Sequence, residues 1–258
     1  MKSDEPWTIL RRFTDARIGL GRAGSALPIR EVLKFAMAHA QARDAVTTPI
    51  DWSSIEAELT FLELAIVRIE SAAGDRDTYL RRPDLGRRLS ARARQHLAGI
   101  AGPSPDLLIL VGDGLSSKGV AANSAGMIEA LMPLVRQSGW SVAPVLLADQ
   151  ARVALGDEAG EFIGARAVLV LIGERPGLSS PDSLGAYLTW APRVGRKDNE
   201  RNCISNIRRG GLSVEEAAFK AHWLLREAFR RQITGVQLKD ESYYQLEGRE
   251  PARPLTRT

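Results

Sequence analysis

The chain has 258 residues, of which 44% are hydrophobic and 26% charged, the balance of an ordinary globular protein in water. Its 35 basic and 31 acidic residues give a net charge of +4, without the basic blocks interleaved with aromatic residues that nucleic-acid binders carry. No apolar run reaches the roughly eighteen residues that a membrane-spanning helix needs. The N-terminus lacks the apolar core of a secretion signal. We therefore expect a cytoplasmic protein that binds neither nucleic acid nor membrane. The single cysteine, Cys203, excludes an internal disulfide and suits a reducing compartment.

Residues 1–27 show little hydrophobic period, but they contain the string GLGRAG from Gly19 to Gly24. This string matches the GxGxxG fingerprint of dinucleotide-binding proteins, which requires a hydrophobic strand before it and a helix that opens within it. Polar residues precede the string, and Pro28 follows too late to begin such a helix. We interpret the segment as an extended arm used in assembly. A stand-alone Rossmann-like nucleotide-binding enzyme is the alternative function.

Residues 28–46 carry apolar side chains three and four positions apart, which predicts a helix with Pro28 in its first turn. A second helix is expected to run to about Leu62, with Ser53 as its N-cap and Glu56 completing a capping box. A short strand, an arginine-rich connector and a short helix follow, at 64–69, 75–92 and 91–100. We expect residues 1–102 to form a mainly helical N-terminal arm and appendage.

Strand and helix patterns alternate after the linker at 102–105, which predicts a doubly wound, mostly parallel, Rossmann-like α/β sheet over residues 103–240. Uninterrupted apolar runs indicate strands that are buried on both faces. The expected strands are 107–111, 142–147, 168–172 and a final edge strand at 235–240; the expected helices are 119–137, 157–163 and 213–231, the last capped by Ser213. Residues 241–258 are polar, and we expect a disordered tail.

The strand that ends at Ile172 is followed by Gly173, Glu174, Arg175 and a polar, glycine-rich, partly apolar segment that reaches residue 207 and that we expect to form a loop system. Ligands of open α/β sheets bind outside the carboxyl ends of the strands, so this segment is a candidate binding site. Asp113, Ser116 and Ser117 follow another predicted strand and could line the same crevice. For these three residues, capping of the next helix is an equally good interpretation.

The sequence lacks the usual signatures of an autonomous catalyst. It has no HExxH, CxxC, phosphate-binding-loop or GxSxG motif. Its three histidines, His39, His96 and His222, lie on separate predicted helices, where a structural hydrogen bond is the usual role. We predict that this chain carries no catalytic residue and no metal ligand of its own.

Six segments, in order, closely resemble the small subunit of ethanolamine ammonia-lyase. The resemblance extends from about Phe13 to Asp240, and several long matches in order are more specific than one short motif. The segments are FTDARIGLGRAG, AHAQARDAV, YLRRPDLGRRLS, GERPGLSSPDSLG, YLTWAPR and ERNCISNI.

The resemblance implies a cofactor and a partner. In this family adenosylcobalamin lies between the small subunit and a large barrel subunit, which holds ethanolamine and the catalytic residues. A radical mechanism then yields acetaldehyde and ammonia. Because no histidine of this chain lies in a D-x-H-x-x-G context, a bound cobalamin would keep its own base on cobalt. The resemblance leaves open whether the hetero-oligomer is enclosed in a bacterial microcompartment, and the short segment before Phe13 favours free cytoplasm.

The resemblance also implies three cofactor contacts, Glu174, Cys203 and Val153, because these positions match contact positions of the family. From the residues alone, Glu174 could instead form an ion pair with an arginine such as Arg175. Cys203 could be a small buried hydrophobic residue. A large partner also favours a subunit contact over a solvated face for the arginine-rich segment, whose members are Arg81, Arg82, Arg87, Arg88, Arg92 and Arg94.

Overall fold

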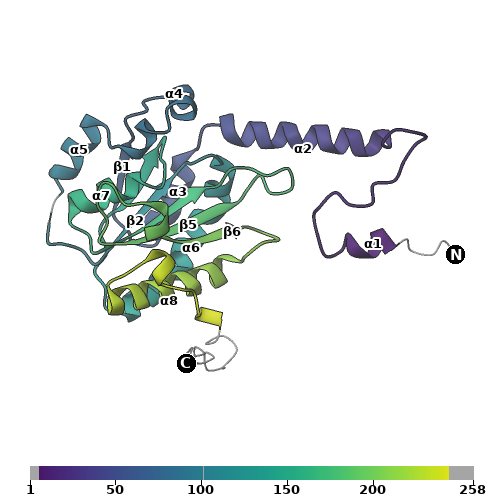
Figure 1. Cartoon of the computed structure of the whole chain (residues 1–258). Coiled ribbons are helices and arrows are strands. Elements are labelled where there is room, and N and C mark those ends of the chain that lie inside the picture. Colours follow the sequence, from purple (N-terminus) through teal and green to yellow (C-terminus); the bar gives the residue numbers. More distant parts are fainter. Residues whose placement is uncertain (1–5, 101, 244–258) are drawn as a thin grey trace.

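The computed structural model describes residues 6–100 and 102–243 and contains a six-stranded sheet in the order β1-β3-β2-β4-β5-β6 (Figure 1). The strands are β1 (Ile66–Glu70), β2 (Leu107–Gly112), β3 (Val145–Asp149), β4 (Ala167–Gly173), β5 (Leu184–Trp190) and β6 (Asn202–Ile207). The first four in this spatial order run parallel, whereas β5 is antiparallel to both β4 and β6. The fold is therefore α/β with a mixed sheet. The expected doubly wound, mostly parallel, Rossmann-like arrangement is not confirmed.

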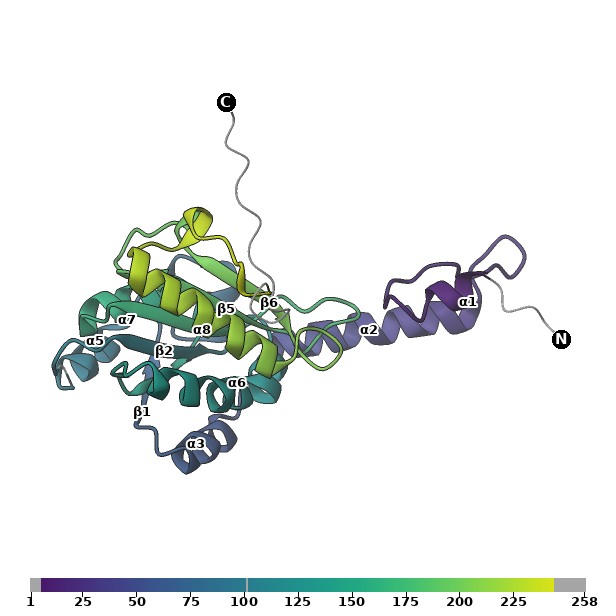
Figure 2. The same ribbon diagram turned by 90° about the horizontal axis from the view of Figure 1, so that it is seen from below.

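Helices cover both faces of the central strands (Figure 2). Helices α3, α6 and α8 pack on one face, and α5 and α7 pack on the other. Every residue of β2 and of β4 is buried, because helices remove both faces of these strands from water. The helices are α1 (Pro6–Leu10), α2 (Ile29–Thr47), α3 (Trp52–Phe61), α4 (Arg76–Arg81), α5 (Ala91–Ala98), α6 (Ser117–Gln137), α7 (Leu155–Ile163) and α8 (Val214–Arg231).

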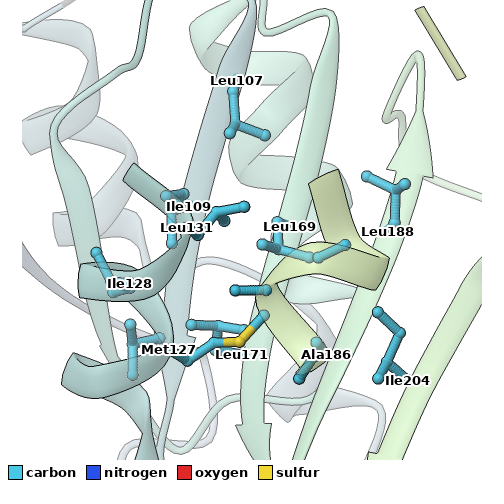
Figure 3. Packing of buried hydrophobic residues seen from close by; sticks show 14 of the residues in the cluster. Leu107, Ile109, Met127, Ile128, Leu131, Leu169, Leu171, Ala186, Leu188 and Ile204 are labelled. Atoms are coloured by element: carbon cyan, nitrogen blue, oxygen red, sulfur yellow. The ribbon is translucent and has the colours of Figure 1, made fainter. Parts of the chain in front are cut away.

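The larger core lies between the sheet and α6 and α8. Figure 3 shows Leu131 of α6 beside Ile109 of β2, with Leu169 of β4 and Leu188 of β5 further along the same core. Side chains of a strand alternate between the two faces of a sheet, so Leu184, Ala186 and Leu188 enter this core and the residues between them face the other way.

Strand β1 belongs to the same sheet as the strands that follow the linker. It pairs with β3 from Ile66 opposite Val145 to Glu70 opposite Asp149. The division predicted at residue 102 therefore does not separate the sheet from the N-terminal hundred residues. None of the described helices is both apolar and long enough for a bilayer.

Helices α1 and α2 form an arm that projects from the body (Figures 1 and 2). No residue of α1 is buried, and only Ala38 and Ala45 of α2 are. The glycine-rich string lies between the two helices with no strand before it, and Gly19 adopts a φ of 55° against the ring of Trp7. This setting lacks the strand and helix that a dinucleotide fingerprint requires.

Three local predictions are wrong. Helix α3 is capped by Asp51, whose carboxylate accepts a hydrogen bond from the N–H of Ser53 at 2.9 Å, so Ser53 is not the cap. Residues 184–190 and 202–207 are strands rather than loop. The expected edge strand at 235–240 is absent, and a 3-10 helix occupies Gly235–Gln237.

The side chain of Asn202 explains the missing edge strand. It accepts the N–H of Gly235 at 2.8 Å and donates to the carbonyl of Leu238 at 2.6 Å, so it bonds backbone groups that a strand would place in a ladder. Ser242, within the predicted tail, is buried. Residues 244–258 of the predicted tail lie outside the described residues.

Candidate functional site

A hollow of about 440 Å³ opens where β2, β3 and β4 end. Strand β3 lies on one side of β2 in the sheet, and the next strand of the chain, β4, lies on the other side of β2. The hollow therefore lies at a topological switch point, where α/β sheets bind ligands. Ten residues line it: Tyr79, Gly114, Leu115, Arg152, Val153, Ile172, Gly173, Glu174, Arg175 and Tyr187. Two of the three predicted contacts, Val153 and Glu174, are among them.

Close approach of two backbone turns forms the floor of the hollow. A Cβ atom at Gly173 would clash with the carbonyl oxygen of Ser116, and one at Gly114 would clash with the carbonyl oxygen of Gly173. Gly114 also adopts a φ of 57°, a backbone conformation that residues with a Cβ atom rarely adopt. The two glycines allow the ends of β2 and β4 to meet without side chains that would fill the space above them.

Glu174 is half-buried, and its carboxylate is held from two directions. Its Oε2 atom accepts the hydroxyl of Ser183 at 2.5 Å and the N–H of Asn206 at 3.1 Å. The ion pair with Arg175 that the sequence left open is not found among the described residues, and Oε1 accepts no hydrogen bond from them. One carboxylate oxygen is thus fixed by the protein while the other is free to accept from a ligand.

Cys203 lies at the rim of the hollow rather than in its lining. It pairs with Tyr187 across β5 and β6, and the thiol and the phenol are hydrogen-bonded. Burial raises the pKa of Cys203, the bond to Tyr187 opposes this, and the nearby charge of Glu174 raises the pKa further. Burial likewise raises the pKa of Tyr187. The residue as a whole is exposed although its thiol is partly shielded from water, so the interpretation as a small buried hydrophobic residue is wrong.

Tyr79 and Arg152 form the wall beside Val153. The guanidinium of Arg152 lies 4.2 Å from the centre of the Tyr79 ring, and the Tyr79 hydroxyl donates to the carbonyl of Ala151 at 3.0 Å. Beside this wall two buried polar atoms, Arg152 Nε and Gln150 Oε1, have no hydrogen-bond partner. Buried polar atoms without partners are rare and often mark a binding site.

Sequence reasoning missed Tyr79 and Tyr187 for different reasons. Tyr79 lies on α4, far along the chain from the rest of the hollow, and nothing local points to it. The alternation of apolar residues in β5 could have identified Tyr187 as facing away from the core.

Asp113, Ser116 and Ser117 do not line the hollow. The carboxylate of Asp113 accepts the N–H of Ala151 at 2.9 Å and pairs with Arg76 at 3.2 Å, while burial raises its pKa to about 6. The Ser116 hydroxyl caps α6 through the N–H of Gly119. The Ser117 hydroxyl donates to the carbonyl at the end of the arm, on Thr48. The capping interpretation holds for Ser116 alone, while Asp113 and Ser117 make other structural contacts.

The histidines lie apart from the hollow. His222 on α8 is within 2.8 Å of the Ser138 hydroxyl, and His39 and His96 lie on α2 and α5. Among residues 6–100 and 102–243, no three His, Cys, Asp or Glu side chains form a group that could hold a metal ion.

The comparison with known proteins agrees with the resemblance seen in the sequence. The family model of the ethanolamine ammonia-lyase light chain matches residues 4–239. A relative in Xanthomonas campestris pv. campestris, named ethanolamine ammonia-lyase small subunit, is 55% identical over 96% of this chain and 92% of its own length. A relative of the same name in Rhodopseudomonas palustris is 52% identical over 96% and 94%, and one in Ralstonia nicotianae is 53% identical over 92% and 89%. On these matches, the chain belongs to the ethanolamine ammonia-lyase light-chain family.

Proposed function

We propose that this chain is the small subunit of an adenosylcobalamin-dependent ethanolamine ammonia-lyase and binds the cofactor jointly with a large subunit. The observation that carries the proposal is the hollow at the switch point, because it brings Val153 and Glu174 together with Cys203 at its rim. These three residues are far apart in the sequence, and only the fold brings them close together. The same proposal places the complex in the cytoplasm, free or inside a microcompartment.

The side chains around the hollow suit a corrin, whose rim carries amide groups that both donate and accept hydrogen bonds. Glu174 Oε1 is a free acceptor for an amide N–H. Arg152 lines the hollow, and its unpartnered Nε is a donor for an amide carbonyl. The ring of Tyr187 and the side chain of Val153 supply apolar contact area, and the buried Tyr79 supports Arg152 from behind. The hydrogen-bonding and apolar groups around the hollow therefore fit the cofactor.

When bound, adenosylcobalamin supplies the radical chemistry that converts ethanolamine to acetaldehyde and ammonia. The work of this chain is to bind and orient the cofactor and to keep water out of the hollow. Glu174 is suited to orientation because Ser183 and Asn206 fix its carboxylate before any ligand arrives. The catalytic residues belong, in this proposal, to the large subunit.

Reconstitution tests the proposal. The purified chain and a large subunit of the same family are mixed with adenosylcobalamin, and ammonia release from ethanolamine is followed. We expect ammonia only when both chains and the cofactor are present. Cofactor affinity, measured by absorbance titration of the complex, should fall about tenfold for Glu174→Gln because the variant loses a charged hydrogen bond.

Glu215→Gln is the matched control, since Glu215 is exposed on the first turn of α8 and lines no hollow. It should leave the affinity unchanged. A complex that assembles but does not bind adenosylcobalamin would contradict the proposed function. Equal affinities for Glu174→Gln and the unaltered complex would instead remove the role assigned to Glu174.

A further inference from the structure

A second hollow, of about 380 Å³, lies beside the first and is mostly basic. It is bounded by the 3-10 helix Leu85–Arg87, the N-terminal end of α7 and the loop that joins β5 to β6. The charged residues that line it are Arg87, Arg88, Asp157, Arg196, Lys197, Asp198 and Arg201.

Three of these cations have no partner in the part of the chain that the structure describes. The side chains of Arg87, Arg88 and Lys197 are exposed and form neither a hydrogen bond nor an ion pair there. Arg196 differs, because it is paired with Glu200 and bonds the carbonyls of two preceding residues. Unpaired like charges around one hollow repel one another and create a potential that attracts an anion.

Arg201 forms the floor of this second hollow. Its side chain is only 3% exposed, and its Nη1 donates to Asp157 at 2.5 Å, so the two buried charges neutralise each other. Its Nε is buried and makes no hydrogen bond, and the nearest carboxylate oxygen, Oδ1 of the exposed Asp198, lies 3.5 Å away. A buried N–H donor without a hydrogen bond is costly, and an anion in the hollow would offer it a closer acceptor after a small adjustment of the side chain.

The two hollows share one face of the sheet. Cys203 lies two positions after Arg201, and Tyr187 lies two positions before Thr189, whose hydroxyl Arg201 contacts at 3.2 Å. Residues two apart on a strand point the same way and lie roughly 7 Å apart. Ala154 of the second hollow directly follows Val153 of the first. A ligand larger than the first hollow can therefore reach the second.

We propose that Arg87, Arg88, Lys197 and Arg201 form a phosphate-binding site, and that the phosphate is the phosphodiester in the nucleotide tail of the bound cobalamin. The assignment of the phosphate to cobalamin rests on the proposed function, whereas the assignment of a phosphate-binding site does not. Guanidinium groups suit the site because their planar N–H groups bond phosphate oxygens in pairs.

The test compares two ligands that differ in the tail. The reconstituted complex is titrated with adenosylcobalamin and with adenosylcobinamide, which lacks the nucleotide and its phosphodiester. The triple variant Arg87→Gln, Arg88→Gln, Lys197→Gln should bind adenosylcobalamin about tenfold more weakly and adenosylcobinamide as before. The triple variant Lys118→Gln, Arg209→Gln, Lys239→Gln removes the same charge from exposed positions outside both hollows and should change neither affinity.

A second measurement tests the phosphate-binding site independently of the molecule that carries the phosphate. Inorganic phosphate is titrated into the full chain alone by calorimetry, and we expect binding that the first triple variant loses and the control keeps. If phosphate binds but the two corrinoids respond alike to the variant, the cofactor is not the source and a free phosphate ester is the ligand. The site is overturned if phosphate does not bind, or if the variant weakens only assembly with the large subunit. If the unaltered complex binds neither corrinoid, the proposed function is contradicted. The phosphate titration alone then decides whether the phosphate-binding site exists.

Discussion

The carboxylate of Glu174 accepts a hydrogen bond from the backbone N–H of Asn206 at 3.1 Å. This bond fastens the turn after β4 to the end of β6, the strand that carries Cys203. The pairing of β5 and β6 shifts register between Leu184 and Ala186, and Asn206 adopts a φ of 60°. A bulge of this kind bends a strand and re-aims its groups, so the irregular end of β6 turns an N–H towards the acid of the site.

Removal of the Ser183 hydroxyl should loosen this arrangement. Ser183→Ala deletes the donor that bonds Glu174 at 2.5 Å, and we expect unfolding free energy to fall by about 1 kcal/mol and cobalamin affinity to fall a few-fold. Urea unfolding and absorbance titration measure the two effects. Ser205→Ala, at an exposed position of β6, is the control and should change neither quantity. Unchanged behaviour of Ser183→Ala would show that Asn206 alone positions the carboxylate.

Asp113 should make the stability depend on pH. Burial raises its pKa from 3.8 to about 6, so the folded chain holds the proton more tightly than the unfolded chain. The stabilisation is complete below the unfolded value and is lost as pH rises through about 6. Asp113→Asn mimics the protonated acid and can keep the acceptor for Ala151. Its stability relative to the unaltered chain should therefore increase between about pH 4 and pH 7, by on the order of 2 kcal/mol.

Urea unfolding at several pH values checks this trend, and Asp106 provides a control of opposite sign. Although burial opposes them, hydrogen bonds from Ser141 and Arg166 lower the pKa of Asp106. Asp106→Asn should lose stability relative to the unaltered chain as pH rises towards the unfolded pKa of 3.8, and the difference should stay constant above about pH 5. A constant difference for Asp113→Asn across the range would contradict the buried, protonated state of Asp113 at low pH.

The ion pair of Asp157 and Arg201 should be costly to break from one side. Both side chains are almost completely buried, at 2% and 3% exposure. Asp157→Ala leaves the Arg201 charge buried without its partner, and we expect a loss of about 3–5 kcal/mol in unfolding free energy. Because Arg201→Met removes that charge, the double variant should be more stable than Asp157→Ala alone. A double variant as unstable as the sum of its single changes would show that the two charges do not interact.

Cys203 should react slowly although the residue is exposed. Partial shielding of its thiol from water raises the pKa of the thiol despite the opposing bond to Tyr187, and the negative charge of Glu174 adds to the increase, so less thiolate exists at neutral pH. Alkylation by iodoacetamide should be slower than that of a free thiol, and mass spectrometry reports this site alone because the chain has one cysteine. Glu174→Gln should accelerate the reaction, whereas Glu215→Gln should not. A rate equal to that of free cysteine would contradict the described environment.

The buried strands could be predicted from sequence, because β2 and β4 are covered on both faces and read as unbroken apolar runs. Strands β5 and β6 could not. Their apolar residues alternate with glycine, polar residues and asparagine, and β6 is held in place largely by its partner. Pattern alone also could not place β1 beside β3, since that pairing joins segments separated by α4, α5 and α6.

Part of the site could likewise be anticipated. The acid at 174 follows a buried strand, and the rule for ligand sites in α/β sheets points to it. The residues contributed by distant elements could not be anticipated, since Tyr79 reaches the hollow from α4 and Arg201 reaches the second hollow from the position just before β6. Their roles depend on packing between segments that have no common local pattern.

The projecting arm should affect how quickly the protein is degraded in a cell. Trp7, Phe13, Leu33 and Met37 are 49–82% exposed, and no side chain of α1 is buried, so detaching or melting the arm costs little free energy. Such segments are cut first by proteases, and exposed aromatic and aliphatic side chains engage chaperones. Molecules made in excess of whatever covers the arm should be degraded early, which would tie the abundance of this chain to the supply of its partner.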